Sequence, residues 1–263
     1  MLQFEHTNLG GDQMHLTNFT LYMDEYLAIH EISDYPDAFN GLQVQGNLEI
    51  QRVALAVDAC SSTIQMAIDS DAQLLVVHHG LFWGQKAPIT GSYYSRLNLL
   101  IKSGIALYSC HLPLDAHPEV GNNHVLARQL GLQITGGFGR HQEAFLGVEA
   151  QGELTRDELT NRISSTLSIT PNVIPTGPKQ LRRIGIITGG AGSYIEEAAD
   201  AGLDTLLTGE GAHHHYFSAE ERGVNLIFAG HYATETVGIL ALQKHIEDRL
   251  NLSTCFLSHP TGL

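Results

Sequence analysis

Residues of the types that commonly bind metal ions stand at the ends of several apolar stretches of the chain. They are His78, His79, His111, Asp115, His231 and Glu235. Imidazole and carboxylate groups are common ligands of divalent cations. Successive side chains of a strand point to opposite faces, so an adjacent histidine pair fits two neighbouring ions, or a chain that turns at Gly80, better than it fits one ion. These residue types point to metal chemistry.

An internal repeat explains why such residues recur. The stretch RVALAVDACSSTIQMAIDSDAQLLVVHHG (52–80) aligns without a gap with RIGIITGGAGSYIEEAADAGLDTLLTGEG (183–211), at an offset of 131. Each copy has an apolar run, a turn of small residues, a helical spacing of apolar residues and a second apolar run. This order predicts a βαβ unit with parallel strands in each copy. Glu210 is the counterpart of His79.

The repeat continues downstream of these units. SGIALYSCHLPLD (103–115) and RGVNLIFAGHYATE (222–235), compared at an offset of 120, pair His111 with His231 and Asp115 with Glu235. Ligands of open α/β sheets bind beyond the carboxyl ends of the strands. The repeat therefore predicts that the candidate ligands of both halves converge.

Each of these residues also has an ordinary structural explanation. A single histidine at a strand end is more often a hydrogen-bonded structural residue than a ligand. Asp115 is compatible with a turn, and Glu235 with a favourable charge at a helix start. The repeat weighs against these explanations, because independent structural reasons would have to coincide in both halves.

Other polar clusters have weaker signals. His213 and His214 follow TGEGA and are expected to open a surface helix, whereas His215 is a candidate to face the site. Asn122 and Asn123 precede VLARQL, and we expect them to cap that helix.

The sequence predicts an α/β fold of two similar halves. With 263 residues the chain can form one large domain or two smaller ones. We expect one α/β half over 1–130 and another over 131–263, facing one another. Residues 1–15 are expected to form a loose leader.

Composition excludes several classes of protein. The formal charge is −14 with only 14 Lys and Arg, so nucleic acid is an unlikely partner. Three scattered cysteines argue against a disulfide framework and a thiolate metal site, and they fit a reducing cytoplasm. No run approaches the length of a membrane helix, and the N-terminus lacks the pattern of a secretory signal. A cytoplasmic protein without membrane attachment is expected.

The long motifs resemble those of one family, the NIF-three-like proteins, also called GTP cyclohydrolase one type two homologues. They are HHGLFW, HLPLDAHPEVGNNHVLA, TGEGAHHHYFSAEERG, AGHYATETVG and NGLQVQG. The resemblance covers nearly the whole chain from about residue 16 and is to the short form without an inserted domain. It implies two interlinked α/β/α domains, a dinuclear metal centre, and a toroidal homohexamer (a trimer of dimers) with the metal sites facing its cavity.

The resemblance also assigns roles to residues. The implied metal ligands are His78, His79, Asp115, His231 and Glu235. His111 matches a position beside the metals. A set of histidines and carboxylates without cysteine accepts Zn, Fe, Mn, Co or Ni, so two divalent ions of unspecified identity are expected per chain.

Two bound ions favour hydrolysis, because they lower the pKa of water and hold a hydroxide nucleophile. The family name suggests ring opening of a small-molecule substrate, a purine nucleotide such as GTP or a related cyclic amide, with His111 or Glu210 moving protons. The alternative is a non-catalytic hexamer that serves as a metal-binding scaffold, store or metallochaperone. A transcriptional or DNA-repair partner is a third possibility, against which the charge argues.

Overall fold

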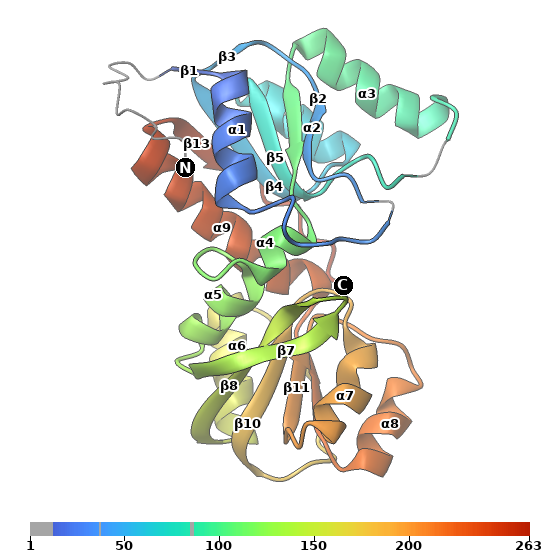
Figure 1. Cartoon of the computed structure of the whole chain (residues 1–263). Coiled ribbons are helices and arrows are strands. Elements are labelled where there is room, and N and C mark those ends of the chain that lie inside the picture. The colour runs from blue at the N-terminus through green and yellow to red at the C-terminus, as the bar shows by residue number, and fades with distance from the viewer. Residues whose placement is uncertain (1–12, 37, 85–86) are drawn as a thin grey trace. The chain divides into compact units, whose positions relative to one another are not determined.

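The computed structural model describes residues 13–36, 38–84 and 87–263, which fold into two compact units (Figure 1). Among the described residues, unit 1 comprises 13–30, 35–111 and 242–259, and unit 2 comprises 31–34, 112–241 and 260–263. These units differ from the sequence halves 1–130 and 131–263. The difference arises because residues 125–130 pack into the core of unit 2, and because a C-terminal strand joins the sheet of unit 1.

Unit 1 is built on a five-stranded sheet in the order β13-β4-β5-β6-β2. Its strands are β2 (Gly41–Val44), β4 (Arg52–Asp58), β5 (Leu74–His79), β6 (Ala106–Ser109) and β13 (Ser253–Phe256). All neighbours pair in parallel except β2, which is antiparallel to β6. A separate pair joins β1 (Met14–His15) to β3 (Glu49–Ile50). The expected leader 1–15 therefore ends in a strand, and residues 1–12 lie outside the described residues.

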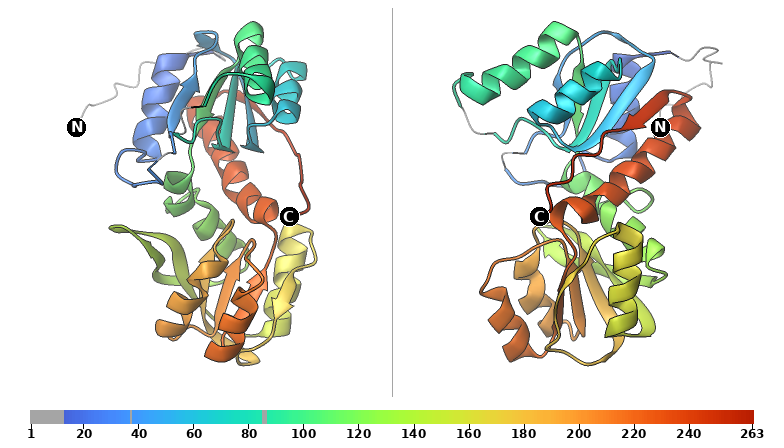
Figure 2. Two further views of the ribbon diagram at one scale, coloured as in Figure 1. Left: turned by 90° about the vertical axis from the view of Figure 1, so that its right-hand side faces the viewer. Right: turned by 180° about the vertical axis from the view of Figure 1, so that it is seen from behind.

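Helices cover both faces of this sheet. They are α1 (Leu16–Tyr26), α2 (Ser61–Asp69), α3 (Gly91–Ser103) and the final part of α9 (His231–Leu250). Ile64 of α2 and Leu97 of α3 join the core cluster with Leu75 of β5. On the opposite face, the ring of Tyr108 meets Phe19 of α1 edge to face at 6.3 Å. Figure 2 shows α1 and the α2–α3 pair on opposite sides of the sheet.

Unit 2 is built on a six-stranded sheet in the order β7-β8-β10-β11-β12-β9. Its strands are β7 (Gln133–His141), β8 (Ala144–Thr155), β9 (Asn172–Ile174), β10 (Gln180–Ile187), β11 (Thr205–Thr208) and β12 (Asn225–Phe228). Strands β10, β11 and β12 are parallel, and the other neighbours are antiparallel.

The sheet of unit 2 also has helices on both faces. They are α4 (Leu112–Ala116), α5 (Asn122–Gln129), α6 (Arg156–Leu167), the short η1 (Gly192–Tyr194), α7 (Ile195–Asp200) and α8 (His215–Arg222). One core cluster holds side chains of α5, α6 and the start of α9. The other holds side chains of α7 and α8. Each unit is thus an α/β/α layered domain, and the predicted fold class is confirmed. No helix in the described ranges has an apolar stretch that could cross a lipid bilayer.

Strand register reveals the internal duplication. Val53 pairs with Leu74, and 131 residues further on Ile184 pairs with Thr205. The same offset holds for the next three residue pairs of both strand pairs. The two predicted βαβ units are therefore confirmed, with matching register.

The next strand of each unit corrects the sequence comparison by one residue. Leu107 pairs with Leu75, and Leu226 pairs with Leu206, so β6 and β12 are related by an offset of 119 and not 120. The structural counterpart of His111 is thus Gly230. The sequence comparison aligned His111 with His231, whereas the pairing of the strands defines which backbone positions are equivalent.

Candidate functional site

Three imidazoles gather at one edge of the unit 1 sheet, and we call them the histidine group (His78, His79 and His111). Strands β5 and β6 are parallel neighbours, so their carboxyl ends meet at the same edge. Ring centroids lie 4.6 Å apart for His78 and His79, and 5.0 and 5.5 Å from His111 to each of them. One ring nitrogen from each lies within 4.8 Å of the others, close enough for all three to bind one ion.

His78 is fully buried and is oriented by the backbone. Its Nδ1 lies 2.9 Å from the carbonyl oxygen of Cys110. A carbonyl oxygen only accepts hydrogen bonds, so Nδ1 carries the proton. In the neutral ring Nε2 then holds the lone pair, which is the form that binds a metal ion.

His79 is oriented by a carboxylate that the sequence reasoning did not identify. Its Nδ1 lies 2.8 Å from Oδ1 of Asp58. Asp58 ends β4 and is the register partner of His79 on β5. The available signal was the acidic residue at the end of the strand VALAVD, because the neighbouring parallel strand ends in a histidine.

The NGLQVQG segment holds the loops that carry the histidine group. The backbone N–H of His111 donates to Oδ1 of Asn40 at 2.7 Å, and that of Leu81 donates to Oε1 of Gln43 at 2.7 Å. At Gly80 a Cβ atom would lie 2.4 Å from the amide of Gln43, so glycine allows this contact. The motif therefore has a structural role beside the candidate ligands.

Trp83 covers one side of the histidine group. Its ring meets that of His111 edge to face at 5.1 Å, and its Nε1–H donates to the carbonyl oxygen of Gly80 at 3.0 Å. The ring of Tyr35 lies 6.0 Å from His111. These aromatic contacts limit the positions that the His111 ring can adopt.

Unit 2 contains a second candidate group around the first turn of α9. Nε2 of His231 lies 3.1 Å from Oε1 of Glu235, one helical turn later. Its Nδ1 lies 2.8 Å from Oε1 of Glu210, which follows β11. The hydrogen bond to Glu235 raises the pKa of His231 to about 9, although burial opposes this; the charge of Glu235 and the contact with Glu210 add to the rise.

Asp115 is buried and accepts hydrogen bonds from the side-chain amides of Asn122 and Asn123. Nδ2 of Asn122 donates to its Oδ1 at 2.8 Å, and Oδ1 of Asn122 accepts from the backbone N–H of Gly238 at 2.8 Å. Nδ2 of Asn123 donates to the carbonyl oxygens of Asp115 and Leu146. The expectation that the two asparagines cap α5 is wrong, because its N-cap is Gly121. Both side chains instead turn toward buried polar partners.

Asp115 and Glu235 flank the same short segment after β10. Oγ1 of Thr188 lies 3.4 Å from Oδ1 of Asp115. A Cβ atom on Gly189 would lie 2.4 Å from Oε1 of Glu235, and the φ angle of Gly189 is +68°. Only glycine adopts this conformation without strain and leaves room for the carboxylate. We call Asp115, Glu210, His231 and Glu235 the carboxylate group.

The triple histidine lies outside both groups. Nδ1 of His215 accepts from the backbone N–H of Ala212 at 2.9 Å, which fixes the start of α8. Burial, followed by the neighbouring His214, lowers the pKa of His215. A Cβ atom on Gly192 would lie 2.4 Å from its ring, so His215 is a packing residue. His213 and His214 are exposed and precede α8, as expected.

The donor set fits divalent cations. Each of the three histidines at a strand end or helix start has an oxygen atom against Nδ1, an arrangement typical of metal-ligating histidines. The carboxylates Asp115 and Glu235 are buried, at 7% and 3% exposure. Nitrogen and oxygen donors without thiolate suit zinc and the first-row metals near it.

Comparison with known proteins identifies the family. The model of Duf34/NIF3 (NGG1p interacting factor 3) matches residues 14–261. The chain belongs to the Duf34/NIF3 family. Duf34/NIF3 relatives named GTP cyclohydrolase 1 type 2 homolog include one from Deinococcus radiodurans, 44% identical with 92% of each chain covered. Another, from Pyrococcus abyssi, is 40% identical over 92% of this chain and 97% of its own.

Solved structures support the same conclusion. The protein TTHA1606 from Thermus thermophilus has a TM-score of 0.88 at 38% identity, covering 95% of this chain and 100% of that one. The protein ybgI, of unknown function, has a TM-score of 0.89 at 36% identity with the same coverage. The resemblance to NIF-three-like proteins is therefore confirmed, and with it the α/β/α fold of the Duf34/NIF3 family.

Proposed function

We propose that this Duf34/NIF3 protein binds two divalent metal ions and hydrolyses a cyclic amide or related ring, such as that of a purine nucleotide. The observation that carries this proposal is the engagement of Nδ1 in His78, His79 and His231 by an oxygen atom. In each case Nε2 is the atom for a cation. The names of the curated relatives point to the same reaction class.

The proposed ligands come from both groups. They are His78, His79, Asp115, His231 and Glu235. When bound, the ions would supply activated water and polarise the bond under attack. Binding would also require His231 to give up the proton that it shares with Glu235. Glu210 holds the imidazole by Nδ1 and keeps Nε2 directed away from itself.

Two residues of the chain are suited to proton transfer. His111 stands within the histidine group with aromatic rings beside it, and its imidazole can donate a proton to a leaving nitrogen. The carboxylate of Glu210 is half exposed and can accept a proton from a ligand. Both are proposed to act on the substrate.

The experiment starts with elemental analysis. Purified protein is expected to hold two ions per chain, whereas Asp115→Ala and Glu235→Ala are expected to lose metal and turnover together. Asp157→Ala removes an exposed carboxylate of α6 and is the matched control, which should keep both. Turnover is followed by chromatography with GTP, other nucleotides and small cyclic amides.

Two results would contradict the proposal. Full metal content in Asp115→Ala and Glu235→Ala would exclude these carboxylates as ligands. Full metal content in the wild type without turnover of any compound, together with rapid transfer of metal to an acceptor, would favour the non-catalytic store or metallochaperone.

The proposal extends to assembly and location. We propose a cytoplasmic homohexamer, as the family resemblance implies. Native mass spectrometry should then give six times the mass of the chain. A stable monomer at micromolar concentration would refute this part without bearing on the metal site.

A further inference from the structure

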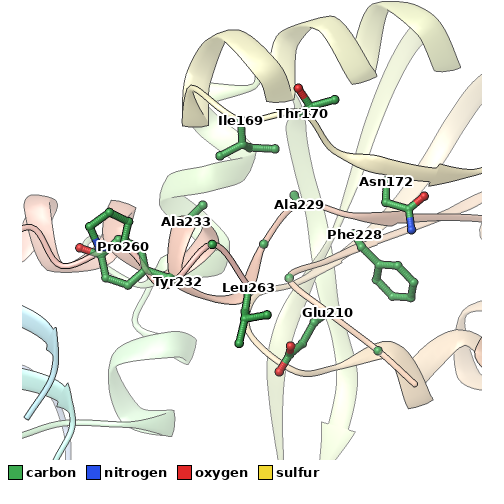
Figure 3. A pocket seen from close by; sticks show the side chains of 14 residues that line it. Ile169, Thr170, Asn172, Glu210, Phe228, Ala229, Tyr232, Ala233, Pro260 and Leu263 are labelled. Atoms are coloured by element: carbon green, nitrogen blue, oxygen red, sulfur yellow. The ribbon is translucent and has the colours of Figure 1, made fainter. Parts of the chain in front are cut away.

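Unit 2 contains a cavity beside the carboxylate group, lined in part by Glu210 (Figure 3). It has a volume of about 380 Å³ and lies beyond the carboxyl ends of β11 and β12, next to the first turn of α9. Open α/β sheets bind ligands at this edge. The size falls within the range of about 300–1,000 Å³ that is usual for small-molecule sites.

The walls of the cavity are mostly apolar. Phe228 and Asn172 lie at one end, and Pro260 and Tyr232 lie at the other (Figure 3). Phe228 and Asn172 are register partners on β12 and β9, so the sheet fixes their spacing. An apolar cavity with aromatic rings favours a flat organic ligand over a hydrated ion.

Glu210 brings a carboxylate to this cavity. Among the described residues that line the cavity, no side chain is cationic, and Glu210 supplies the one acidic side chain. An anionic group would therefore be repelled, whereas a ligand with N–H donors would be attracted. One oxygen of Glu210 accepts from His231, and a carboxylate can accept further hydrogen bonds through the other.

We propose that this cavity binds an uncharged cyclic amide, with its ring against Phe228 and its N–H donated to Glu210. Asn172, the register partner of Phe228, supplies a donor and an acceptor at the same end of the cavity. A triphosphate has no counter-charge here, so phosphate groups stay outside the cavity. The identification of this ligand as substrate rests on the proposed function, whereas its binding does not require metal.

Binding can be tested on metal-free full-length protein by isothermal titration calorimetry. Inosine is the probe, because its base is an uncharged cyclic amide with an N–H. In 1-methylinosine this N–H is replaced by a methyl group. Loss of a hydrogen bond to a charged acceptor costs about ten- to a hundredfold in affinity, so 1-methylinosine should bind that much more weakly.

Variants test the location. Ala233→Leu places a larger side chain at the cavity wall and is expected to weaken inosine binding at least about tenfold. Ala201→Leu makes the same change at an exposed position of unit 2 outside the cavity and should leave binding unchanged. Circular dichroism and metal content of both variants show whether the fold is retained.

The outcomes separate this inference from the proposed function. No inosine binding by the wild type, equal affinity for 1-methylinosine, or unchanged affinity in a folded Ala233→Leu would each overturn the inference, whatever the metal content. Inosine binding with the expected pattern would support it, even in a protein that proves to hold no metal.

Discussion

Oδ1 of Asp58 lies 2.8 Å from Nδ1 of His79, across the parallel pair β4–β5. The carboxylate fixes the orientation of the ring and increases the basicity of Nε2. Asp58→Ala is therefore expected to lower metal affinity about 10- to 100-fold. Competition against a fluorescent chelator would measure the metal affinity of the variant and of the wild type. Asp69→Ala, at an exposed position of α2, is the control, and equal affinities in the two variants would show that Asp58 does not support a ligand.

Metal uptake is expected to depend on pH through His231. The pKa of its imidazole is raised to about 9, first by the hydrogen bond to Glu235. An ion on Nε2 must displace this proton, so near neutral pH each His231 should release one proton. Affinity should fall about tenfold per unit as the pH decreases below 9. Calorimetry in buffers of different ionisation enthalpy counts the protons, and a count of zero would contradict the assignment.

The same pKa predicts the stability of the metal-free protein. A pKa raised in the folded state stabilises the protein fully below the unfolded value of 6.5, and this contribution is lost as the pH rises through about 9. The melting temperature of chelator-treated wild-type protein should therefore fall more between pH 7 and 10 than the melting temperature of chelator-treated His231→Gln. The two proteins share all their other titrating groups. Equal slopes for the two proteins would show that the ion pair does not stabilise the fold.

Asn122 is predicted to be important for stability as well as for the site. It is fully buried, donates to Asp115 and accepts from the backbone of Gly238. Asn122→Ala removes one hydrogen bond to the buried Asp115 carboxylate and the acceptor of the buried Gly238 N–H, so we expect it to lower the free energy of unfolding by about 2–4 kcal/mol. Urea denaturation of the metal-free protein would measure this. Asn161→Ala, at an exposed position of α6, should change it little, and an Asn122→Ala variant of full stability would refute the argument.

Trp83 offers a direct optical test of the histidine group. It is the only tryptophan of the chain, and its ring lies 5.1 Å from His111 and 6.1 Å from His79. Binding of Co²⁺ at these imidazoles should quench its fluorescence, with saturation at the metal content found by elemental analysis. Fluorescence that does not respond, in protein that nevertheless takes up Co²⁺, would place the ion elsewhere.

The sequence predicted the fold well where the local pattern of residues agrees with the observed strand pairing. The repeat at an offset of 131 predicted two βαβ units, and their register follows it residue by residue from Val53 and Ile184. The capping box of α6 is likewise visible in the sequence, because Thr155 and Glu158 have the spacing that it requires. Oγ1 of Thr155 accepts from the N–H of Glu158, and the Glu158 carboxylate accepts from the N–H of Thr155. These features depend on residues close together in the chain, or on a repeated pattern.

Features that depend on distant contacts were not predictable in the same way. Asn122 resembles a helix cap by sequence, but its partner Gly238 lies 116 residues away. Asp58 gave little sign of its role, because its partner belongs to the next strand of the sheet. The division into units differs from the sequence halves for the same reason, since β13 pairs with β4.

The pairing of β13 with β4 has a consequence for folding during synthesis. Cys255 pairs with Ala54, so this edge of the unit 1 sheet cannot close until residues 253–256 have left the ribosome. Residues 112–241 of unit 2 emerge earlier and can fold as a body before that. Unit 1 thus begins first on the ribosome but is completed only after residues 112–241 of unit 2 have been made, and until then an apolar strand edge stays open to chaperones or to aggregation.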